Sequence, residues 1–176
     1  MNGQIGKEHI LIEPDLFKRG MRRLASGVSL VTTAHKGMRF GLIATSVSSV
    51  SAEPPTLLVC VNRASSSHEP LTVAGSFCVN LLSVDHDQIA RRFSSSGERD
   101  KRFQIGDWRT LETGAPALAG SLASFDCDVV HRVEISSHTV FFGEVRSLEL
   151  WSEHRAPLVY VNGQYLQSSP AACPPV

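Results

Sequence analysis

Apolar residues in this chain either alternate with polar ones or run unbroken over short stretches. Unbroken runs such as 56–61 and 77–82 are typical of strands that are buried on both faces. The segments 123–135 and 139–150 alternate apolar and polar residues for much of their length, which predicts strands with one buried face and one wet face. The predicted strands are 28–34, 39–45, 56–61, 77–82, 123–135, 139–150 and a last one that begins at 157.

Helical periodicity is confined to short segments. In 14–24 the apolar residues share one helical face and the basic residues take the other, a pattern typical of an amphipathic helix. Ser66 and Glu69 have the spacing of a capping box, and Asp85 suits the N-cap of the helix that follows it. The polar, charged run at 94–105 predicts a surface loop. The predicted helices are 14–24, 65–74 and 85–93.

The balance of elements defines the expected architecture. About six to eight strands with two or three short helices predict a mainly β fold, in the form of a closed or partly closed barrel. A length of 176 residues fits one domain, which we expect to span 14–167. Residues 1–13 are predicted to form a flexible arm, and the proline-rich end at 168–176 a flexible tail.

Charge and composition exclude several classes of function. Seventeen basic and 17 acidic residues give a formal net charge of zero, whereas a nucleic-acid-binding protein normally presents a basic surface. No apolar run approaches the ~20 residues that span a bilayer, and the first residues lack the apolar core of a signal peptide. We therefore expect a cytoplasmic protein that binds neither nucleic acid nor membrane.

The four cysteines, at positions 60, 78, 127 and 173, are widely spaced and contain no C-x-x-C pair. In a chain of this length that spacing does not indicate a disulfide framework or a zinc site. Cys60, Cys78 and Cys127 are interpreted as buried small hydrophobic residues, and the histidines show no ligand spacing with one another. No metal site is expected.

The stretch 44–51 is the richest in side-chain hydroxyls, and Pro54-Pro55 closes it. Small hydroxyl residues both donate and accept hydrogen bonds, so they can match the alternating donors and acceptors on the edge of a flat polar ring without crowding it. The alternative is a polar sheet edge or a solvent-facing strand. The hydroxyl residues are Thr45, Ser46, Ser48, Ser49 and Ser51.

Two further segments carry groups that suit an anion. Residues 62–68, Asn-Arg-Ala-Ser-Ser-Ser-His, lie between a buried strand and a predicted helix, and both a helix N-terminus and an arginine attract phosphate. The alternative is an ordinary serine N-cap beside a surface arginine. Arg91-Arg92-Phe93 and Arg102-Phe103 could contact a phosphate or stack on a ring, although a solvated helix end is the simpler interpretation. His138, between the two long strands, could bind a ligand or be an exposed turn histidine.

In this order and spacing, the motifs resemble the flavin reductase family of split-barrel proteins, the small reductase components of two-component flavin monooxygenases. The resemblance runs from about Phe17 to Leu166. The motifs are Gly41-x-x-Ala44-Thr45-Ser46-Val47-x-Ser49-Val50-Ser51 with Pro54-Pro55, the Ser/His segment 65–68, Phe77-Cys78-Val79-Asn80-Leu81-Leu82, Pro116-x-Leu118-x-Gly120-Ser121-Leu122-Ala123, His138-x-x-x-x-Gly143-Glu144-Val145, and Pro157-Leu158-Val159-Tyr160.

The resemblance implies an FMN-binding split β-barrel with Greek-key-like connections and a homodimer with flavin near the subunit interface. It implies that FMN or FAD is reduced by NADH, or alternatively NADPH, and is then delivered to a reduced-flavin-dependent monooxygenase, by contact or by diffusion only. We expect NADH, because no arginine pair is evident that would read a 2′-phosphate.

The resemblance also implies roles for residues. The residues that would hold the isoalloxazine and ribityl chain are Thr45, Ser46, Val47, Ser48 and Ser49, with Ser51. Those that would lie near the phosphate are Asn62, Arg63, Ser66 and Ser67, and those that would close over the flavin are Arg102 and Phe103. The catalytic histidine, near the nicotinamide, would be His138. Two departures stand out. Ser136-Ser137 replaces the Gly-Asp that often precedes this histidine, and Ile43-Ala44-Thr45 replaces Thr-Ala-Asn.

Other functions remain open on the sequence. A flavin-binding sensor or carrier without turnover is favoured by the altered turn before His138. A split-barrel oxidase or reductase could instead keep flavin as a fixed prosthetic group and act on another substrate. A small-barrel binding module without flavin is the remaining alternative.

Overall fold

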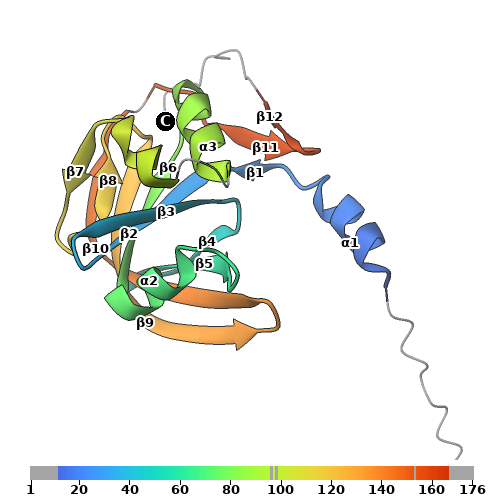
Figure 1. Cartoon of the computed structure of the whole chain (residues 1–176), viewed down its shortest axis with the longest axis horizontal. Helices are drawn as coiled ribbons and strands as arrows, with labels where there is room; N and C mark the ends of the chain where they lie inside the picture. The colour runs from blue at the N-terminus through green and yellow to red at the C-terminus, as the bar shows by residue number, and fades with distance from the viewer. Residues whose placement is uncertain (1–11, 96, 98, 153, 167–176) are drawn as a thin grey trace, which may run out of the picture.

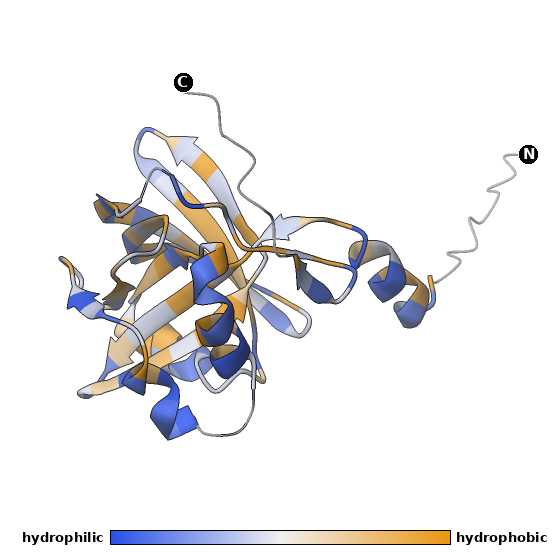
Figure 2. Ribbon diagram, turned by 90° about the horizontal axis from the view of Figure 1, so that it is seen from above, coloured by the Kyte–Doolittle hydropathy of each residue, from blue (hydrophilic) through white to orange (hydrophobic). Residues whose placement is uncertain are grey.

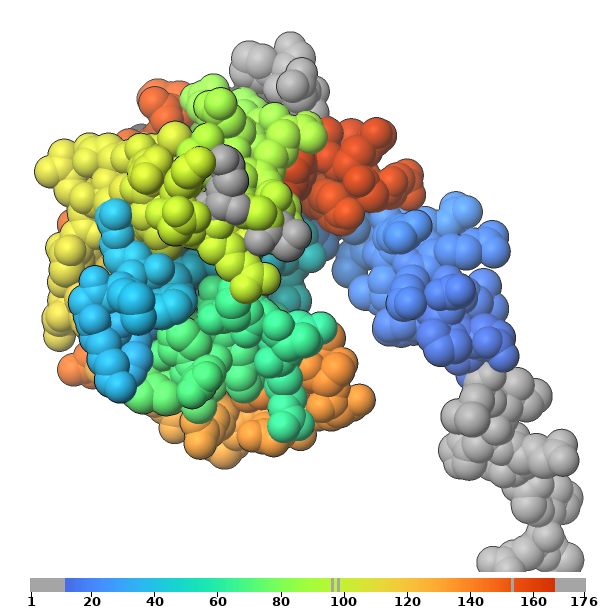
Figure 3. All heavy atoms as spheres, in the orientation of Figure 1, coloured from blue at the N-terminus to red at the C-terminus, as the bar shows by residue number. Residues whose placement is uncertain are grey.

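The computed structural model describes residues 12–166 except 96, 98 and 153. The predicted arm at 1–13 and tail at 168–176 therefore lie almost entirely outside the described residues. The first described helix, α1 (Pro14–Met21), ends earlier than the predicted 14–24. It stands clear of the body of the molecule (Figure 3), and its apolar residues Leu16, Phe17 and Met21 are exposed.

A seven-stranded antiparallel sheet with the order β3-β2-β6-β9-β10-β5-β4 forms the body of the fold (Figure 1). Its strands are β2 (Ser29–His35), β3 (Met38–Ala44), β4 (Val47–Ala52), β5 (Pro55–Asn62), β6 (Ser76–Leu81), β9 (Ala123–Ile135) and β10 (His138–Leu150). β3 and β4 follow each other in the chain but lie at opposite ends of this order, so the sheet curls round until its two ends are close. The sequence prediction of a partly closed, mainly β barrel is confirmed.

Smaller elements cover the ends of the barrel. β1 (Ser26–Gly27), β11 (Val159–Val161) and β12 (Gln164–Leu166) form a three-stranded sheet, and β7 (Trp108–Thr110) pairs with β8 (Pro116–Leu118). The helices are α2 (His68–Ala74) and α3 (Asp87–Ser94), with 3-10 turns at Val84–His86 and Arg99–Gln104. α2 packs beside β2, and α3 packs beside β3.

The inward side chains of the sheet fill the barrel. Phe77, Phe141 and Val59 are fully buried there, and the hydropathy colouring shows apolar residues along the strands (Figure 2). Gly143 sits against this cluster, where a Cβ would come within 2.5 Å of Phe77 Cζ. A second cluster joins Leu30 and Leu82 to Phe93 of α3, so α3 is anchored against the β2–β3 end of the barrel.

Three predicted boundaries were wrong. The strand predicted at 39–45 ends at Ala44, and the hydroxyl-rich stretch continues as a separate strand, β4. The helix predicted at 65–74 begins at His68, so its N-cap is Ser67 and the expected capping box of Ser66 and Glu69 does not form. The Ser67 hydroxyl donates to Gly41 O at 3.1 Å. Asp85 is not an N-cap: it lies within the 3-10 turn that precedes α3.

Two predicted environments also differ. The charged loop at 94–105 contains the 3-10 turn Arg99–Gln104 and a buried Arg102. Cys60 is only half-buried, whereas Cys78 and Cys127 are buried; all three are free thiols. Burial alternates along β5, with Val59 and Val61 buried, so Cys60 points outward. None of the helices in the described part of the chain is long and apolar enough to cross a membrane.

Candidate functional site

Two pockets lie end to end along β3, the strand at one edge of the large sheet. Met38 to Gly41 line the first pocket, and Leu42, Ile43 and Thr45 line the second. The segment after β5 forms the opposite wall of both, with Ser66 and Ser67 in the first and Ser65 in the second. An edge strand has unpaired backbone groups along one side, so both pockets have a polar backbone wall.

We call the first pocket the arginine pocket. It has a volume of about 370 Å³. Its polar lining consists of Arg39, Ser66, Ser67, Arg99, Asp100 and Arg102. Three arginines against one aspartate give this pocket a net positive lining, which suits an anion.

Arg102 is the most unusual of these arginines, because it is only 9% exposed. Its Nη1 donates to Gly41 O at 3.3 Å, and its Nη2 donates to Ser95 O. Its buried Nε has no hydrogen-bond partner, and no carboxylate among the described residues forms an ion pair with it. Burial, and then the nearby Arg99, lowers the pKa of Arg102. A buried cation without a counter-charge is costly, so this geometry would suit a ligand that supplies negative charge.

Gly41 connects the parts of the arginine pocket. Its carbonyl accepts from both the Ser67 hydroxyl at 3.1 Å and Arg102 Nη1 at 3.3 Å. A Cβ at this position would lie 2.7 Å from Phe93 Cε1, so only glycine fits against the present position of that ring. The pocket is flanked by Phe103, whose ring lies 4.8 Å below the Arg39 guanidinium and 5.1 Å from the ring of Phe93.

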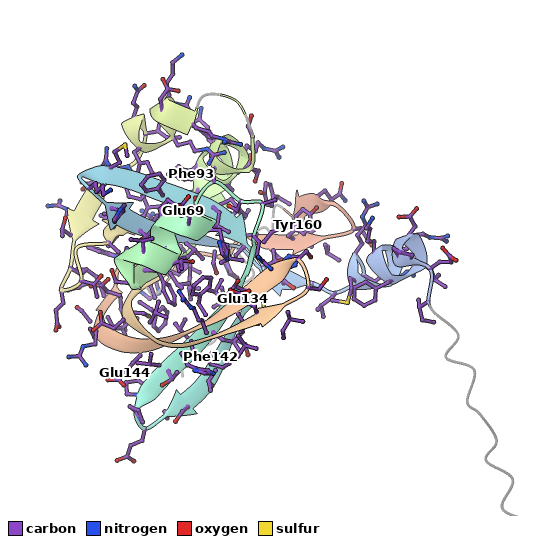
Figure 4. The ribbon with its side chains drawn as sticks, turned by 60° about the horizontal axis from the view of Figure 1, so that its bottom comes forward. Glu69, Phe93, Glu134, Phe142, Glu144 and Tyr160 are labelled. Carbon is purple, nitrogen blue, oxygen red and sulfur yellow. The ribbon has the colours of Figure 1, made fainter. Side chains whose placement is uncertain are left out.

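We call the second pocket the tyrosine pocket. It has a volume of about 430 Å³. Tyr160 and Tyr165 pack edge to face with ring centroids 5.6 Å apart, and the Tyr165 hydroxyl lies 3.1 Å from Ser94 Oγ. Phe93 and Tyr160 lie on the same side of the barrel (Figure 4). The other lining residues are Leu42, Ile43, Thr45, Asn62 and Ser65. Aromatic and apolar walls with a few hydroxyl and amide groups suit a flat polar ring.

Alternation along β3 places further polar groups in the tyrosine pocket. Residues two apart in an antiparallel strand present their backbone groups to the same side. Because Gly41 O faces the pocket side of β3, the N–H and C=O of Ile43 face the same side. A ring in this pocket would therefore meet both a backbone donor and a backbone acceptor.

The structure divides the predicted hydroxyl stretch. Only Thr45 lines the tyrosine pocket. Val47, Ser48, Ser49 and Ser51 line a third pocket of about 280 Å³ with Leu57 and Phe125, elsewhere on the barrel. The Ser46 hydroxyl donates to Cys60 O at 3.1 Å, and Ser51 forms a local turn with Glu53.

The predicted phosphate segment is divided in the same way. Ser66 and Ser67 lie in the arginine pocket and Asn62 in the tyrosine pocket. Arg63 lines neither of them: its exposed side chain lies 3.6 Å from that of Glu134. Arg102 and Phe103, predicted to close over a flavin, line the arginine pocket.

His138 is exposed at the start of β10, directly opposite Asn62 of β5. Its Nδ1 lies 2.9 Å from the Ser137 hydroxyl. Asn62 lines the tyrosine pocket, whereas His138 is not among the residues that line either pocket. The serine at position 137 thus provides a contact to the imidazole.

Several lining residues were not identified from the sequence, namely Arg39, Arg99, Tyr160 and Tyr165. The two tyrosines lie in a hairpin more than 50 residues beyond Arg102, and no local pattern connects those segments. Clusters of three or more residues able to hold a metal do not occur in the described part of the chain.

Taken together, the two pockets would accept a flat aromatic ring that carries a phosphate group. Residues 21–169 match the family model described as "Flavin reductase like domain". Among curated proteins, the chain is 44% identical over 156 residues to FMN reductase (NADH) RutF 1 of Methylorubrum extorquens strain PA1, covering 89% of this chain and 77% of that protein.

Two solved structures are similar along almost the whole chain. Nitrilotriacetate monooxygenase component B from Mycobacterium thermoresistibile has a TM-score of 0.84 and 32% identity, covering 92% of this chain and 90% of that chain. The NADH:FAD oxidoreductase SgcE6 of Streptomyces globisporus C-1027, in complex with NAD and FAD fragments, has a TM-score of 0.82 and 30% identity, covering 93% of this chain and 99% of that chain.

Proposed function

The chain belongs to the flavin reductase family, and on this premise we propose that it is an NADH-dependent flavin reductase that supplies reduced FMN or FAD to a partner monooxygenase. The observation that carries the proposal is the buried, unpaired Arg102 in a pocket continuous along β3 with an aromatic one. Phosphate and isoalloxazine are the two chemical groups that these pockets would bind.

We infer the following arrangement of residues. Arg102 and Ser66 would bind the flavin phosphate, while Ser67 holds Gly41 and the segment after β5 in place through its 3.1 Å hydrogen bond. The ring would lie in the tyrosine pocket, against Phe93 and Tyr160. There the backbone of Ile43 and the side chains of Thr45 and Asn62 provide donors and acceptors for the polar edge of the ring.

The hydride chemistry belongs to the coenzymes: nicotinamide C4 donates a hydride and flavin N5 accepts it. The protein binds and orients the two rings, which supplies much of the rate acceleration in such reactions. Backbone and hydroxyl donors around the ring would stabilise negative charge that develops on it. His138, which is paired across the strands with Asn62, would contact the nicotinamide, so its imidazole would position the hydride donor.

We also propose a homodimer in which the outer face of β5, β10 and β9 is the interface. Two rows of paired residues run across these three strands. One row consists of Leu58, Phe142 and His131, and the other of Cys60, Val140 and Val133. Paired residues share one face of a sheet, and Val59 and Val61 face the core. The outer face therefore carries a band of apolar side chains, and Phe142 lies on this side of the molecule (Figure 4). Such bands are typical of protein interfaces.

The interface proposal has a direct test. Phe142→Asp places a charge in the centre of the apolar band and should convert the dimer to a folded monomer, as measured by light scattering during gel filtration. Val73→Asp, a substitution at an exposed apolar residue of α2 outside this face, is the control and should stay dimeric. A wild-type protein that is monomeric at micromolar concentration would contradict the proposal.

The function itself is tested by steady-state oxidation of NADH and NADPH with FMN, FAD and riboflavin in turn, followed at the absorbance of the reduced nicotinamide. We expect oxidation with NADH and FMN or FAD well above the rate with free flavin. We place the protein in the cytoplasm, where NADH is available, and we expect its product to be consumed by a monooxygenase either in contact or after diffusion. Oxidation no faster than that with free flavin, for both nucleotides, would refute the proposal.

A further inference from the structure

The segment that carries the serines of the arginine pocket is attached at both ends to the turn that carries His138. At one end, the Arg63 N–H donates to Ser137 O at 2.9 Å. At the other end, His68 Nε2 lies 2.8 Å from the Thr139 hydroxyl. Ser66 and Ser67 lie between these attachments. The segment and the turn are therefore joined in two places, by the backbone at one end and by a single side-chain pair at the other.

The contact between His68 and Thr139 is well enclosed. Thr139 is 1% exposed, so its hydroxyl depends on a protein partner, because an unsatisfied buried hydroxyl is destabilising. The imidazole of His68 is also fixed by an edge contact with Phe141, with ring centroids 5.7 Å apart. Burial, and then the charge of Arg63, lowers the pKa of His68. The ring is therefore neutral near neutral pH, with one nitrogen that donates and one that accepts.

A short chain of bonds runs through this contact from the arginine pocket to His138. Gly41 O accepts from the Ser67 hydroxyl, and Ser67 is bonded directly to His68. His68 contacts Thr139, which is bonded directly to His138. Gly41, which lines the arginine pocket, and His138 are thus separated by two hydrogen bonds and two peptide links.

We propose that His68 is a positioning residue of the reductase, whose bond to Thr139 holds His138 at a fixed place relative to the serines of the arginine pocket. The inference rests on the proposed function, because the two ends that it connects are the flavin phosphate and the nicotinamide. His68 lines neither pocket among the described residues, so it acts through its neighbours. A displacement of about 1 Å in such a site can cost on the order of 100-fold in rate.

The test compares His68→Leu with His68→Gln. Leucine removes the hydrogen bond, whereas the glutamine amide can reach the Thr139 hydroxyl. With His68→Leu, we expect kcat/KM for NADH to fall about tenfold or more. The dissociation constant of FMN in the absence of NADH should change less than about threefold, since Arg102 and Ser66 are untouched. His68→Gln should recover most of kcat/KM. Thr139→Val should reproduce the leucine variant, and the double variant should cost no more than either single change, as for one shared interaction.

A matched control separates positioning from general loss of stability. Thr33 is also 1% exposed, and its hydroxyl donates to Ser76 O at 2.8 Å, between β2 and β6. Thr33→Val should lower the melting temperature about as much as Thr139→Val and leave kcat/KM for NADH unchanged. If both valine variants lose activity in proportion to stability, the role of His68 is structural only and the proposal is wrong.

A second readout needs no turnover. The imidazole NMR signals of His138 in flavin-free protein should shift or broaden in His68→Leu and return in His68→Gln. Signals that stay at their wild-type positions in the leucine variant would overturn the inference. If the wild-type protein does not oxidise NADH, the proposed function fails, and this NMR comparison still decides whether His68 places His138.

Discussion

Replacing Arg102 by methionine separates ligand binding from folding. The guanidinium is buried, its Nε has no partner, and its other nitrogens donate to the carbonyls of Gly41 and Ser95. Methionine keeps the length of the side chain and removes the charge. A charge-assisted hydrogen bond contributes about 1.5–3 kcal/mol. Loss of one such bond to the flavin phosphate should therefore weaken FMN binding about 10- to 150-fold.

The same substitution should have little effect on the protein without flavin. Replacing a buried charge that has no counter-charge by an apolar group is often neutral or stabilising, and Gly41 O keeps its hydrogen bond from Ser67. We expect the melting temperature of the flavin-free variant to stay within about 2–4 °C of the wild type, which corresponds to about 1 kcal/mol for a domain of this size.

Riboflavin provides the internal control, because it has the same ring and no phosphate. Fluorescence titration of Arg102→Met should show weaker binding of FMN and unchanged binding of riboflavin. FMN at 100 times its wild-type dissociation constant stabilises the wild type by about 2.7 kcal/mol, whereas a 100-fold weaker variant would gain only about 0.4 kcal/mol at that concentration. Arg109→Gln, at an exposed ion pair with Asp107 outside both pockets, should behave as wild type. Equal losses for FMN and riboflavin, or none for either, would refute the assignment of Arg102 to the phosphate.

Three further predictions concern the ring site, the core and pH. Tyr160→Ala should weaken the binding of FMN and of riboflavin alike, by about 0.5–1.5 kcal/mol or more for the lost ring contact. If the same titrations show weaker binding of FMN alone, the proposed location of the flavin ring is wrong. Gly143→Ala should lower the free energy of unfolding by about 1–3 kcal/mol, because its Cβ would meet Phe77 Cζ at 2.5 Å and Cys127 Cβ at 2.8 Å; an unchanged urea midpoint would show that the barrel relaxes there. Burial, and then Arg155, lowers the pKa of His86 in the folded protein, and its Nδ1 accepts from the Ser83 N–H at 3.2 Å. The stability of the protein should therefore fall as the pH drops below the histidine pKa of the unfolded chain, about 6.5. His86→Asn, whose amide oxygen can take the place of Nδ1, should flatten that dependence in melting experiments between pH 7.5 and 5, and an equally steep dependence in the variant would exclude His86 as its source.

Much of the barrel could be predicted from the sequence, because strand patterns are local. The alternation at 123–135 and 139–150 and the apolar run at 56–61 produced strands at nearly the predicted bounds. The errors lie where tertiary contacts override local signals. Ser67 has the chemistry of a helix cap, but its hydroxyl bonds to Gly41 O on a strand that is 26 residues away in the chain. Similarly, Arg102 lies in a run that looks fully solvated, and only the fold buries it.

The site was predictable in its chemistry but not in its arrangement. Ser66, Ser67, Arg102 and Phe103 meet in one pocket as a phosphate site requires, whereas Arg63, in the same predicted segment, turns away towards Glu134. The two sets of residues differ in the direction of their side chains. The Arg63 N–H donates to Ser137 O, and in this position the Arg63 side chain points towards Glu134 of β9. Sequence spacing gives the residues near a site, while the hydrogen bonds of the backbone decide which of them face it.

The hydroxyl-rich stretch illustrates how one sequence signal can serve two purposes. Thr45 faces the tyrosine pocket at the end of β3, and Ser46 closes the barrel by bonding Cys60 O. Beyond this point the chain crosses to the other edge of the sheet, so Ser48 and Ser49 face a different pocket from Thr45. A sheet that curls until its edges nearly meet needs polar residues where the chain leaves one edge for the other, because the backbone there lacks regular partners. The same exposed backbone is what a flat polar ring can bind. Ligand binding would use Thr45 and closure of the barrel uses Ser46, and these neighbouring roles explain why the hydroxyl count alone could not separate a site from a sheet edge.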